Sequence, residues 1–405
     1  MILKSSPVIS LLIALSVLSS KSIFGQIEKD STNEKYSFTK RIELPSSPVK
    51  DQASSGTCWS YASCSFLESE ILRMTHDTLD ISEMYFVRMN YAEKAKRFVR
   101  LHGTSNFGEG GQAHDVMDVV ANSGLLLNSD YTGLANGQEK PDHAEMEAVL
   151  EAIVRTIVKN PSGKLSPNWM KTIEAVLDVY LGPKPVTTAY KGQSLTPVQL
   201  RDKLGIVPDN YIELTSYTQQ PFYSSFMLEI PDNWRMASYY NVPLDELIQV
   251  MDNSLEKGFT IEWDGDVSDR GFSFKNQLAI VPDITLKNAT AEEQQKWGKL
   301  TEKERKKQFF SFENVVPEKL VTQEIRQAAF DNYSATDDHL MHITGTGTDQ
   351  SGKRYFLTKN SWSAESNDYG GFMYLSDSYV RMNTIAILVN KDSLPKDIRK
   401  KLNLE

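Results

Sequence analysis

Apolar residues recur at helical spacing through much of the first half of the chain, and at strand spacing near its end. The spacing predicts helices over residues 58–74, 81–96, 112–123 and 243–257, and strands over 340–345, 354–358, 371–376 and 384–390. Ser82 is a plausible N-cap of the second helix, and Gly124 ends the third. Helices that precede strands in this way predict an α+β fold with a cleft between the two parts.

The pattern is less regular between these segments. Residues 103–111 form a glycine-rich loop, and 145–182 are helical in pattern again. Residues 195–240 mix aromatic-rich, extended pieces, and 258–263 predict a strand. The highly charged range 292–309 predicts an exposed helix or excursion, and 322–331 a short helix.

The first 25 residues have the order of features of a signal peptide. Lys4 supplies a positive charge, 8–18 form an apolar core, and 20–25 are a small-residue exit before Gln26. A buried first strand or helix is the alternative. We expect export to the periplasm or the medium, a mature start near Gln26 and a flexible lead over 26–44. No second long apolar run follows, so membrane insertion after removal of the signal is not expected.

Composition narrows the class of protein. The 405 residues are 40% hydrophobic and 24% charged, as in ordinary globular proteins. The net charge of −9 argues against a nucleic-acid partner. The two cysteines, Cys58 and Cys64, lie on one predicted helix about 9 Å apart along its axis, beyond the reach of a disulfide. Cys64 is most simply a small buried residue.

Cys58 has the setting of a nucleophile. It begins a predicted helix, and the positive end of a helix lowers the pKa of a thiol. Gln52, six residues earlier, offers an amide donor for an oxyanion. A nucleophilic thiol also requires a histidine and a side chain that orients it.

Two histidines are candidates for that base. His339 and His342 share the segment Asp337-Asp338-His339-Leu340-Met341-His342, and Asn360 follows in Lys359-Asn360-Ser361-Trp362. Side chains three residues apart in a strand point to opposite faces, so both histidines cannot face Cys58 or jointly bind a metal. No metal and no cofactor are predicted.

These motifs together resemble the papain-type cysteine peptidases. The similarity lies in Cys-Trp-Ser-Tyr-Ala-Ser after a Gln, in an Asp-His pair entering a strand that leaves through Gly345 and Gly347, and in Lys-Asn-Ser-Trp. In that family His and Asn follow the cysteine by about 130–150 residues, whereas here they follow by 281 and 302. An insertion of this size resembles the bleomycin hydrolase and aminopeptidase C group. That group is also similar in four shorter segments, 52–56, 108–112, 241–244 and 263–267.

The resemblance implies a papain-like fold in two parts. A helical part over 45–150 holds the nucleophile, and an antiparallel β part over 311–390 holds His and Asn. Between them, 151–310 is a long, mainly helical insertion with a connecting subdomain.

The resemblance also assigns roles. Cys58 attacks as a thiolate, His339 stabilises it as an imidazolium and protonates the leaving amine, Asn360 orients the imidazole, and Gln52 with the Cys58 N–H forms the oxyanion hole. Supporting and binding roles fall to Trp59 and Trp362, the latter shielding the Asn–His bond, and to Gly110 and Gly111, whose backbone would pair with a bound peptide. The motif register favours His339, and His342 is the alternative base.

The expected function is hydrolysis of peptides from the N-terminus. In the aminopeptidase group a C-terminal arm restricts the cleft to chain ends, and the tail 391–405 is too short for such an arm. An endopeptidase of the same chemistry is therefore the alternative, and an inactive peptide-binding homologue is a third reading. The group's hexameric ring makes a homo-oligomer an expectation.

Overall fold

The computed structural model describes residues 35–135, 137–160 and 162–404. The predicted signal peptide and the first part of the predicted flexible lead, 26–34, lie outside the described residues. From Lys35 onward the chain forms one compact unit. None of the described helices is long and apolar enough to cross a membrane.

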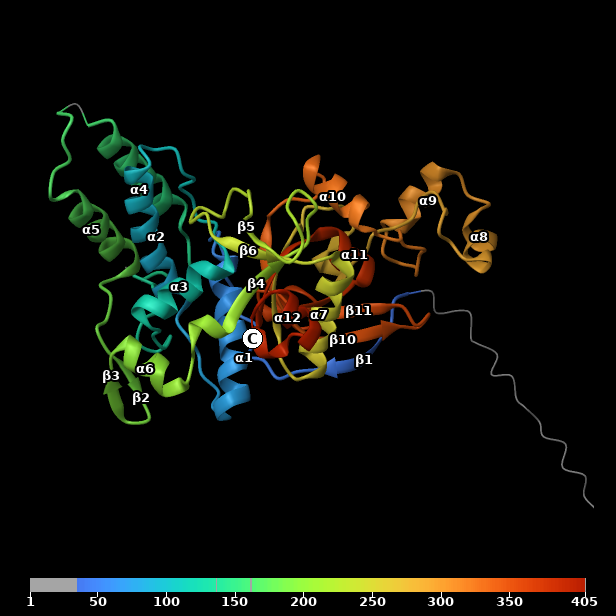
Figure 1. The fold of residues 1–405 in the computed structure, drawn as a ribbon, viewed down its shortest axis with the longest axis horizontal. Coiled ribbons are helices and arrows are strands. Elements are labelled where there is room, and N and C mark those ends of the chain that lie inside the picture. Colours follow the sequence, from blue (N-terminus) through green and yellow to red (C-terminus); the bar gives the residue numbers. More distant parts are fainter. Residues whose placement is uncertain (1–34, 136, 161, 405) are drawn as a thin grey trace, which may run out of the picture. The chain divides into compact units, whose positions relative to one another are not determined.

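The helices gather into two groups (Figure 1). The helices are α1 (Cys58–Thr75), α2 (Glu83–Arg100), α3 (Ala113–Ser123), α4 (Ala144–Val158), α5 (Trp169–Leu181), α6 (Pro197–Leu204), α7 (Leu244–Glu256), α8 (Ala291–Trp297), α9 (Glu302–Phe309), α10 (Gln323–Asp331), α11 (Asp377–Asn383) and α12 (Lys396–Lys401). Helices α1 to α6 share one apolar core, which includes Phe66, Phe86 and Leu150. Helices α7, α11 and α12 contribute to a second core with the sheet. The helices α1 to α6 from the first half of the chain therefore pack in one region, and the sheet packs with the later helices α7, α11 and α12 in a second region.

One sheet of eleven strands holds the second region together. The strands of the chain are β1 (Phe38–Glu43), β2 (Thr188–Tyr190), β3 (Gln193–Leu195), β4 (Tyr211–Thr215), β5 (Ser225–Met227), β6 (Ser238–Asn241), β7 (Ile261–Gly265), β8 (Phe272–Ser273), β9 (Leu278–Ala279), β10 (His339–Asp349), β11 (Arg354–Lys359), β12 (Phe372–Ser376) and β13 (Thr384–Asn390). The sheet has the order β5-β6-β4-β13-β7-β10-β11-β12-β9-β8, with β1 paired to β10, while β2 and β3 form a separate hairpin. Pairs within the sheet are antiparallel except β4–β6 and β9–β12. The predicted α+β class is confirmed.

Strand β10 can lie against β1 because of two glycines. A Cβ on Gly345 would overlap the Ile42 carbonyl oxygen, and one on Gly347 would come within 3.1 Å of the Thr39 carbonyl oxygen. A side chain at either position would push the two strands apart. The Gly-x-Gly exit of the histidine motif thus serves strand pairing.

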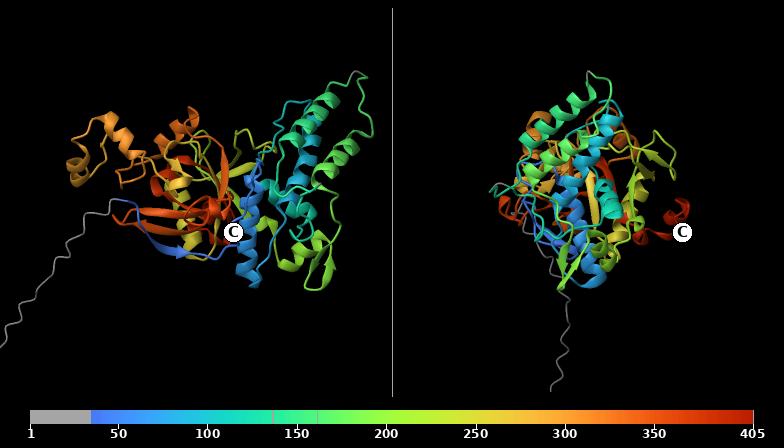
Figure 2. Two further views of the ribbon diagram at one scale, coloured as in Figure 1. Left: turned by 180° about the vertical axis from the view of Figure 1, so that it is seen from behind. Right: turned by 90° about the vertical axis from the view of Figure 1, so that its left-hand side faces the viewer.

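The segment 151–310 is mainly helical, as predicted, but it is not helical throughout. It holds α5 to α9, but strands β4 to β9 also come from it, and these six belong to the main sheet. Short strands whose partners lie far along the chain leave little periodic signal, whereas amphipathic helices such as α5 and α7 leave a strong one. Helices α8 and α9 project on the side of the sheet away from α4 and α5 (Figure 2).

The described C-terminal residues pack on α7. The Ser393 hydroxyl lies 2.6 Å from that of Ser254, and the Lys401 ammonium lies 2.7 Å from the Glu246 carboxylate. Thr384 and His339 both pair with Gly265, so the far end of β13, at Asn390, leads the tail away from His339. The tail contains the short helix α12, whose last turn carries Arg399, Lys400 and Lys401.

A buried ion pair joins the two regions. His114 Nδ1 on α3 lies 2.9 Å from Glu213 Oε2 on β4. Burial opposes the charge on His114, but the Glu213 carboxylate outweighs it and raises the His114 pKa to about 9. The imidazolium is therefore the form present at neutral pH.

Glu213→Gln should lower stability in a pH-dependent way. A folded pKa above the unfolded value of about 6.5 means that the stabilisation is fully present below pH 6.5 and is lost as pH rises through about 9. We expect a deficit of about 3 kcal/mol at pH 6, because a tenfold change in proton affinity corresponds to about 1.36 kcal/mol and the His114 pKa is raised from 6.5 to about 9. Urea unfolding of both proteins at pH 6 and pH 9.5 measures it, and an equal deficit at both pH values would contradict this account.

Candidate active site

Cys58 is the first residue of α1. Thr57 is its N-cap and makes no side-chain capping bond, so the α1 N-terminus keeps unpaired N–H groups near the thiol. The Leu340 backbone also hydrogen-bonds Cys58, which brings strand β10 to the thiol. The thiol therefore lies next to the strand that begins at His339.

His339 and Asn360 are in direct contact. His339 Nε2 lies 2.7 Å from Asn360 Oδ1, which also accepts a hydrogen bond from the Ser361 N–H. The Trp362 ring lies over the imidazole, with 4.7 Å between centroids, and Phe272 and Phe274 pack edge-on against Trp362. Since Asn360 Oδ1 can only accept, it fixes the tautomer that carries its proton on Nε2 and leaves Nδ1 as a base.

Gln52 is tied to the same segment. Its Oε1 accepts from the Ser361 hydroxyl at 2.6 Å, and its backbone N–H donates to the Ser361 carbonyl. Its Nε2 donates one hydrogen to the Ser55 carbonyl at 2.7 Å, leaving a second hydrogen for another acceptor. The loop before α1 is thus held against the loop after β11.

Trp59 positions the glycine-rich loop. Its Nε1–H donates to the Glu109 carbonyl at 2.9 Å, and a Cβ on Gly111 would come within 3.0 Å of its ring. A Cβ on Gly110 would overlap the carboxylate of Asp232. A side chain at Gly110 would therefore displace the Asp232 carboxylate, and one at Gly111 would press on the Trp59 ring and the Asp115 carboxylate.

His342 lies elsewhere. Its Nδ1 is 2.8 Å from the Ser65 hydroxyl on α1, and its ring meets Phe66 edge-on. Ser65 is seven residues from Cys58, which is about 10 Å along a helix axis. The structure brings His339, and not His342, to Asn360.

Burial opposes charge on both reacting groups. It raises the pKa of the Cys58 thiol to about 12, against the hydrogen bond from Leu340. It lowers the pKa of His339 to about 4, against the bond to Asn360. Burial therefore works against the predicted thiolate–imidazolium pair, because a dry pocket solvates charges poorly.

Three carboxylates near the thiol were not singled out from the sequence. Asp232, Asp337 and Asp264 all raise the pKa of Cys58 further. Asp337 stands in the histidine motif, two residues before His339, and could have been noticed there. Asp232 lies in an aromatic-rich stretch without periodicity, so no signal pointed to it.

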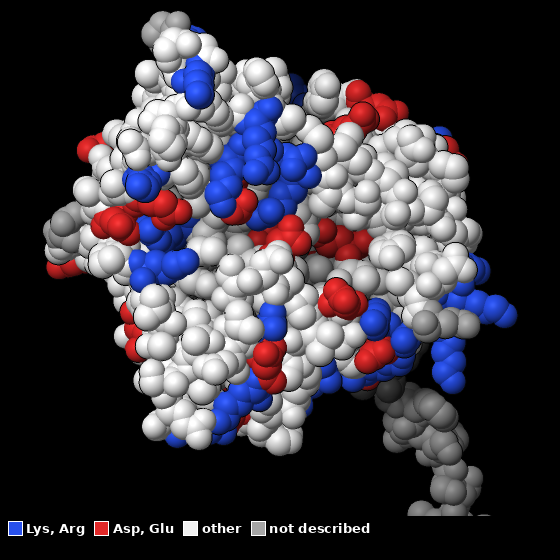
Figure 3. Space-filling view, turned by 60° about the vertical axis from the view of Figure 1, so that its left-hand side comes forward, with Lys and Arg blue, Asp and Glu red and all other residues white. Residues whose placement is uncertain are grey.

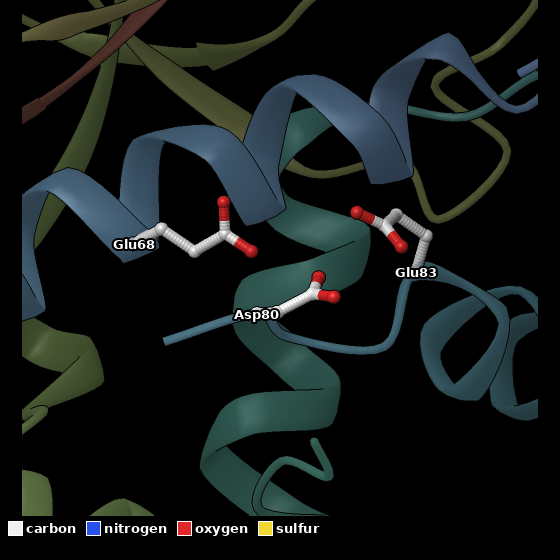
Figure 4. A group of neighbouring side chains, drawn as sticks. All are labelled: Glu68, Asp80 and Glu83. Atoms are coloured by element: carbon white, nitrogen blue, oxygen red, sulfur yellow. The ribbon is translucent and has the colours of Figure 1, made fainter. Parts of the chain in front are cut away.

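A second acidic cluster resembles a metal site but is already neutralised. Glu68 on α1, Asp80 in the segment between α1 and α2, and Glu83 at the start of α2 point toward one another (Figure 4). The Lys50 ammonium lies 3.1, 2.5 and 2.5 Å from their respective oxygens. Although burial works against its charge, Glu83 and Glu68 raise the Lys50 pKa well above its ordinary value. The lysine occupies the place a cation would take.

The chain is similar to two curated aminopeptidases over most of its length. No family model matches it. It is 21% identical to aminopeptidase G of Lactobacillus delbrueckii subsp. lactis over 398 residues, which are 88% of this chain and 83% of the relative. It is 21% identical to aminopeptidase C of Lactobacillus helveticus over 409 residues, 89% of this chain and 83% of the relative. The chain is a homologue of these aminopeptidases.

A solved structure shares the fold. PepW from Lactobacillus rhamnosis HN001 superposes with a TM-score of 0.69 and 17% identity, over 91% of this chain and 85% of PepW. The predicted resemblance to the papain-like cysteine peptidases of the bleomycin hydrolase and aminopeptidase C group is confirmed by these relatives and this fold.

Lys50→Met should destabilise the protein by about 2–4 kcal/mol, because three carboxylates would lose their shared cation. Burial raises the pKa of Glu83, so protonation at low pH relieves the repulsion first in the variant. We expect a larger deficit at pH 8 than at pH 5 in urea unfolding. A deficit that grows toward low pH would contradict the assignment of Lys50 as the neutralising group.

Proposed function

We propose that this chain is a cysteine peptidase that uses Cys58, His339 and Asn360. The observation that carries the proposal is the 2.7 Å contact between His339 Nε2 and Asn360 Oδ1 beneath Trp362, with Leu340 at the thiol of Cys58. Homology to aminopeptidases C and G, over nearly the whole chain, supports the same class of enzyme.

The burial of the pair suggests how the proton moves. Because burial disfavours charge on both groups, we propose that the thiol proton passes to His339 Nδ1 as sulfur attacks the scissile carbonyl. The α1 N-terminus favours the negative sulfur during this step. His339 then gives the proton to the leaving amine, and the acyl-enzyme is hydrolysed by water with His339 as the base. Asn360 holds the ring in one tautomer throughout.

The oxyanion would be held by the Cys58 N–H and the free hydrogen of Gln52 Nε2. Gln52 is positioned for this by its bonds to Ser361 and Ser55. Removing one such donor commonly costs about 10²–10³ in kcat.

We propose further that the enzyme is an aminopeptidase acting on peptides, as the names of its relatives suggest. The endopeptidase alternative has its own support, because described residues 396–404 dock on α7 and not beside His339. An inactive peptide-binding homologue is the third candidate, although it retains all four residues of the proposed site.

Export through the N-terminal signal and assembly into a homo-oligomer, a hexamer by resemblance, also remain proposals.

Single replacements test the site. Cys58→Ala and His339→Ala should lower kcat by roughly 10³-fold or more, since each removes a group that no neighbour replaces. His342→Ala should keep kcat but lose about 1–3 kcal/mol of stability, because it leaves the hydrogen of the Ser65 hydroxyl without its acceptor and a gap beside Phe66. Initial rates on a fluorogenic aminoacyl substrate, with urea unfolding in parallel, decide the roles. An inactive His342→Ala beside an active His339→Ala would assign the base to His342.

Paired substrates separate the two kinds of peptidase. A peptide with a free α-amine and the same peptide N-acetylated differ only in the charge and size of the terminus. We expect cleavage of the free peptide, one residue at a time from its N-terminus, with at least tenfold slower turnover of the acetylated one. Mass spectrometry of the products identifies the bond. Cleavage of the acetylated peptide alone would contradict the proposal of an aminopeptidase, whereas the proposal of a cysteine peptidase would stand.

A further inference from the structure

The carboxylate of Asp232 covers Gly110. This carboxylate occupies the space that a Cβ atom on Gly110 would take. Asn106 Nδ2 donates a hydrogen bond to Asp232 Oδ1 at 3.1 Å. In the proposed site the Gly110 backbone is where a peptide extending past the scissile residue would lie. Asp232 therefore leaves little room for such an extension.

The loop that carries Asp232 is firmly held. Trp234 Nε1 and Arg235 Nε donate to the buried Asp115 carboxylate at 2.8 and 2.7 Å. The side chain of Asn233 donates to the Leu228 and Ala237 carbonyls, both at 2.9 Å. Because the following residues Asn233 and Trp234 are held by these hydrogen bonds, the position of Asp232 is fixed by the fold.

Two more carboxylates stand behind it. Both oxygens of the half-buried Asp337 accept from Gln112 Nε2 at 3.0 Å. Asp264 on β7 pairs with Leu340, whose backbone meets Cys58, and its side chain interacts with Asp337. Asp264 is only 3% exposed, and neither of its oxygens has a hydrogen-bond donor among the described residues. Burial and the neighbouring Asp337 raise the pKa of Asp264 well above its usual range, so Asp264 holds a proton that it can donate to Asp337 and the two together carry one negative charge.

The cations near these carboxylates do not balance them. The buried Lys94 ammonium donates to the Gly108 carbonyl at 2.7 Å and to the Gly110 carbonyl, so it holds the glycine-rich loop. Arg235 is paired with Asp115. Figure 3 shows one face of the molecule on which acidic side chains follow a depression across the middle, with basic side chains above them. Of these three carboxylates, only Asp232 interacts with the Lys94 ammonium, which also interacts with Asp115.

We infer that Asp232, backed by Asp337 and Asp264, binds the α-ammonium group of a peptide substrate and limits the enzyme to one residue on the acyl side of the scissile bond. This inference rests on the proposed peptidase function. An ammonium fits better than a metal ion, since the three carboxylates do not converge as a ligand set. It also has N–H donors for oxygens that lack them.

The test compares Asp232→Asn with Asp209→Asn. Asparagine keeps the shape and the acceptor for Asn106 but removes the charge, and the exposed Asp209 loses the same charge far from the loop. Each protein is assayed on alanyl and lysyl fluorogenic amides, on N-acetyl-alanyl amide, and on the propionyl amide, which lacks only the amine. Labelling of Cys58 by iodoacetamide, read by mass spectrometry, reports whether the site is intact.

For Asp232→Asn we expect at least a tenfold lower kcat/KM on the alanyl amide, mainly through KM, with acetylated and propionyl substrates unchanged or faster. Asp209→Asn should match the wild type. An equal loss of kcat/KM on all substrates would mean that Asp232 has only a structural role. A loss of kcat/KM confined to the lysyl amide would mean that Asp232 binds the lysine side chain of the substrate. An unchanged preference for the free amine overturns the inference while the peptidase stands. If the wild type hydrolyses no substrate, the proposed function itself fails.

If Asp232→Asn does not fold, Asp337→Asn serves as the second variant. Its amide can still accept from Gln112, and the charge next to the ammonium is again removed. The same loss on the free amine alone is expected, and an unchanged preference for the free amine would overturn the inference.

Discussion

The site depends on how the buried helix α1 lies across the sheet. Three polar side chains of α1 reach the strands: Ser63 donates to Glu262 at 2.6 Å, Ser65 meets His342 at 2.8 Å, and Glu70 accepts from Asn390 at 2.8 Å. These bonds set the helix in one register over β7, β10 and β13. A slip by one residue would move Cys58 by about 1.5 Å along the axis and break all three bonds.

Exclusion of water shapes the chemistry as much as the residue types do. The same burial that protects the bond between His339 and Asn360 opposes charge on Cys58 and His339, so the proton is best transferred within the pair during attack. A dry site also makes its unpaired carboxylates expensive. The Lys50 ammonium neutralises the carboxylates of Glu68 and Glu83. In the proposed site, the α-ammonium group of a substrate would neutralise Asp232 in the same way, and the enzyme would prefer peptides with a free N-terminus.

Strong local patterns were predicted well. The amphipathic helices α1, α2, α3 and α7 and the strands β10 to β13 appear where the spacing of apolar residues predicted them, with Ser82 capping α2. Within 151–310 the sequence predicted a strand at 258–263 and extended pieces in 195–240, but it did not predict β8 and β9, because pieces of two residues are stabilised by partners elsewhere in the chain. Local propensity does not record such partners.

Residue identity and order along the chain were enough to predict a peptidase site made of Cys58, His339, Asn360 and Gln52, because each residue stands in a short motif that is typical of this chemistry. Tertiary packing alone decided that His342 bonds Ser65, that Lys50 fills the acidic cluster, and that Asp232 covers Gly110. These are contacts through space between segments without a shared pattern. Their energies arise from burial and charge, which exist only once the chain has folded.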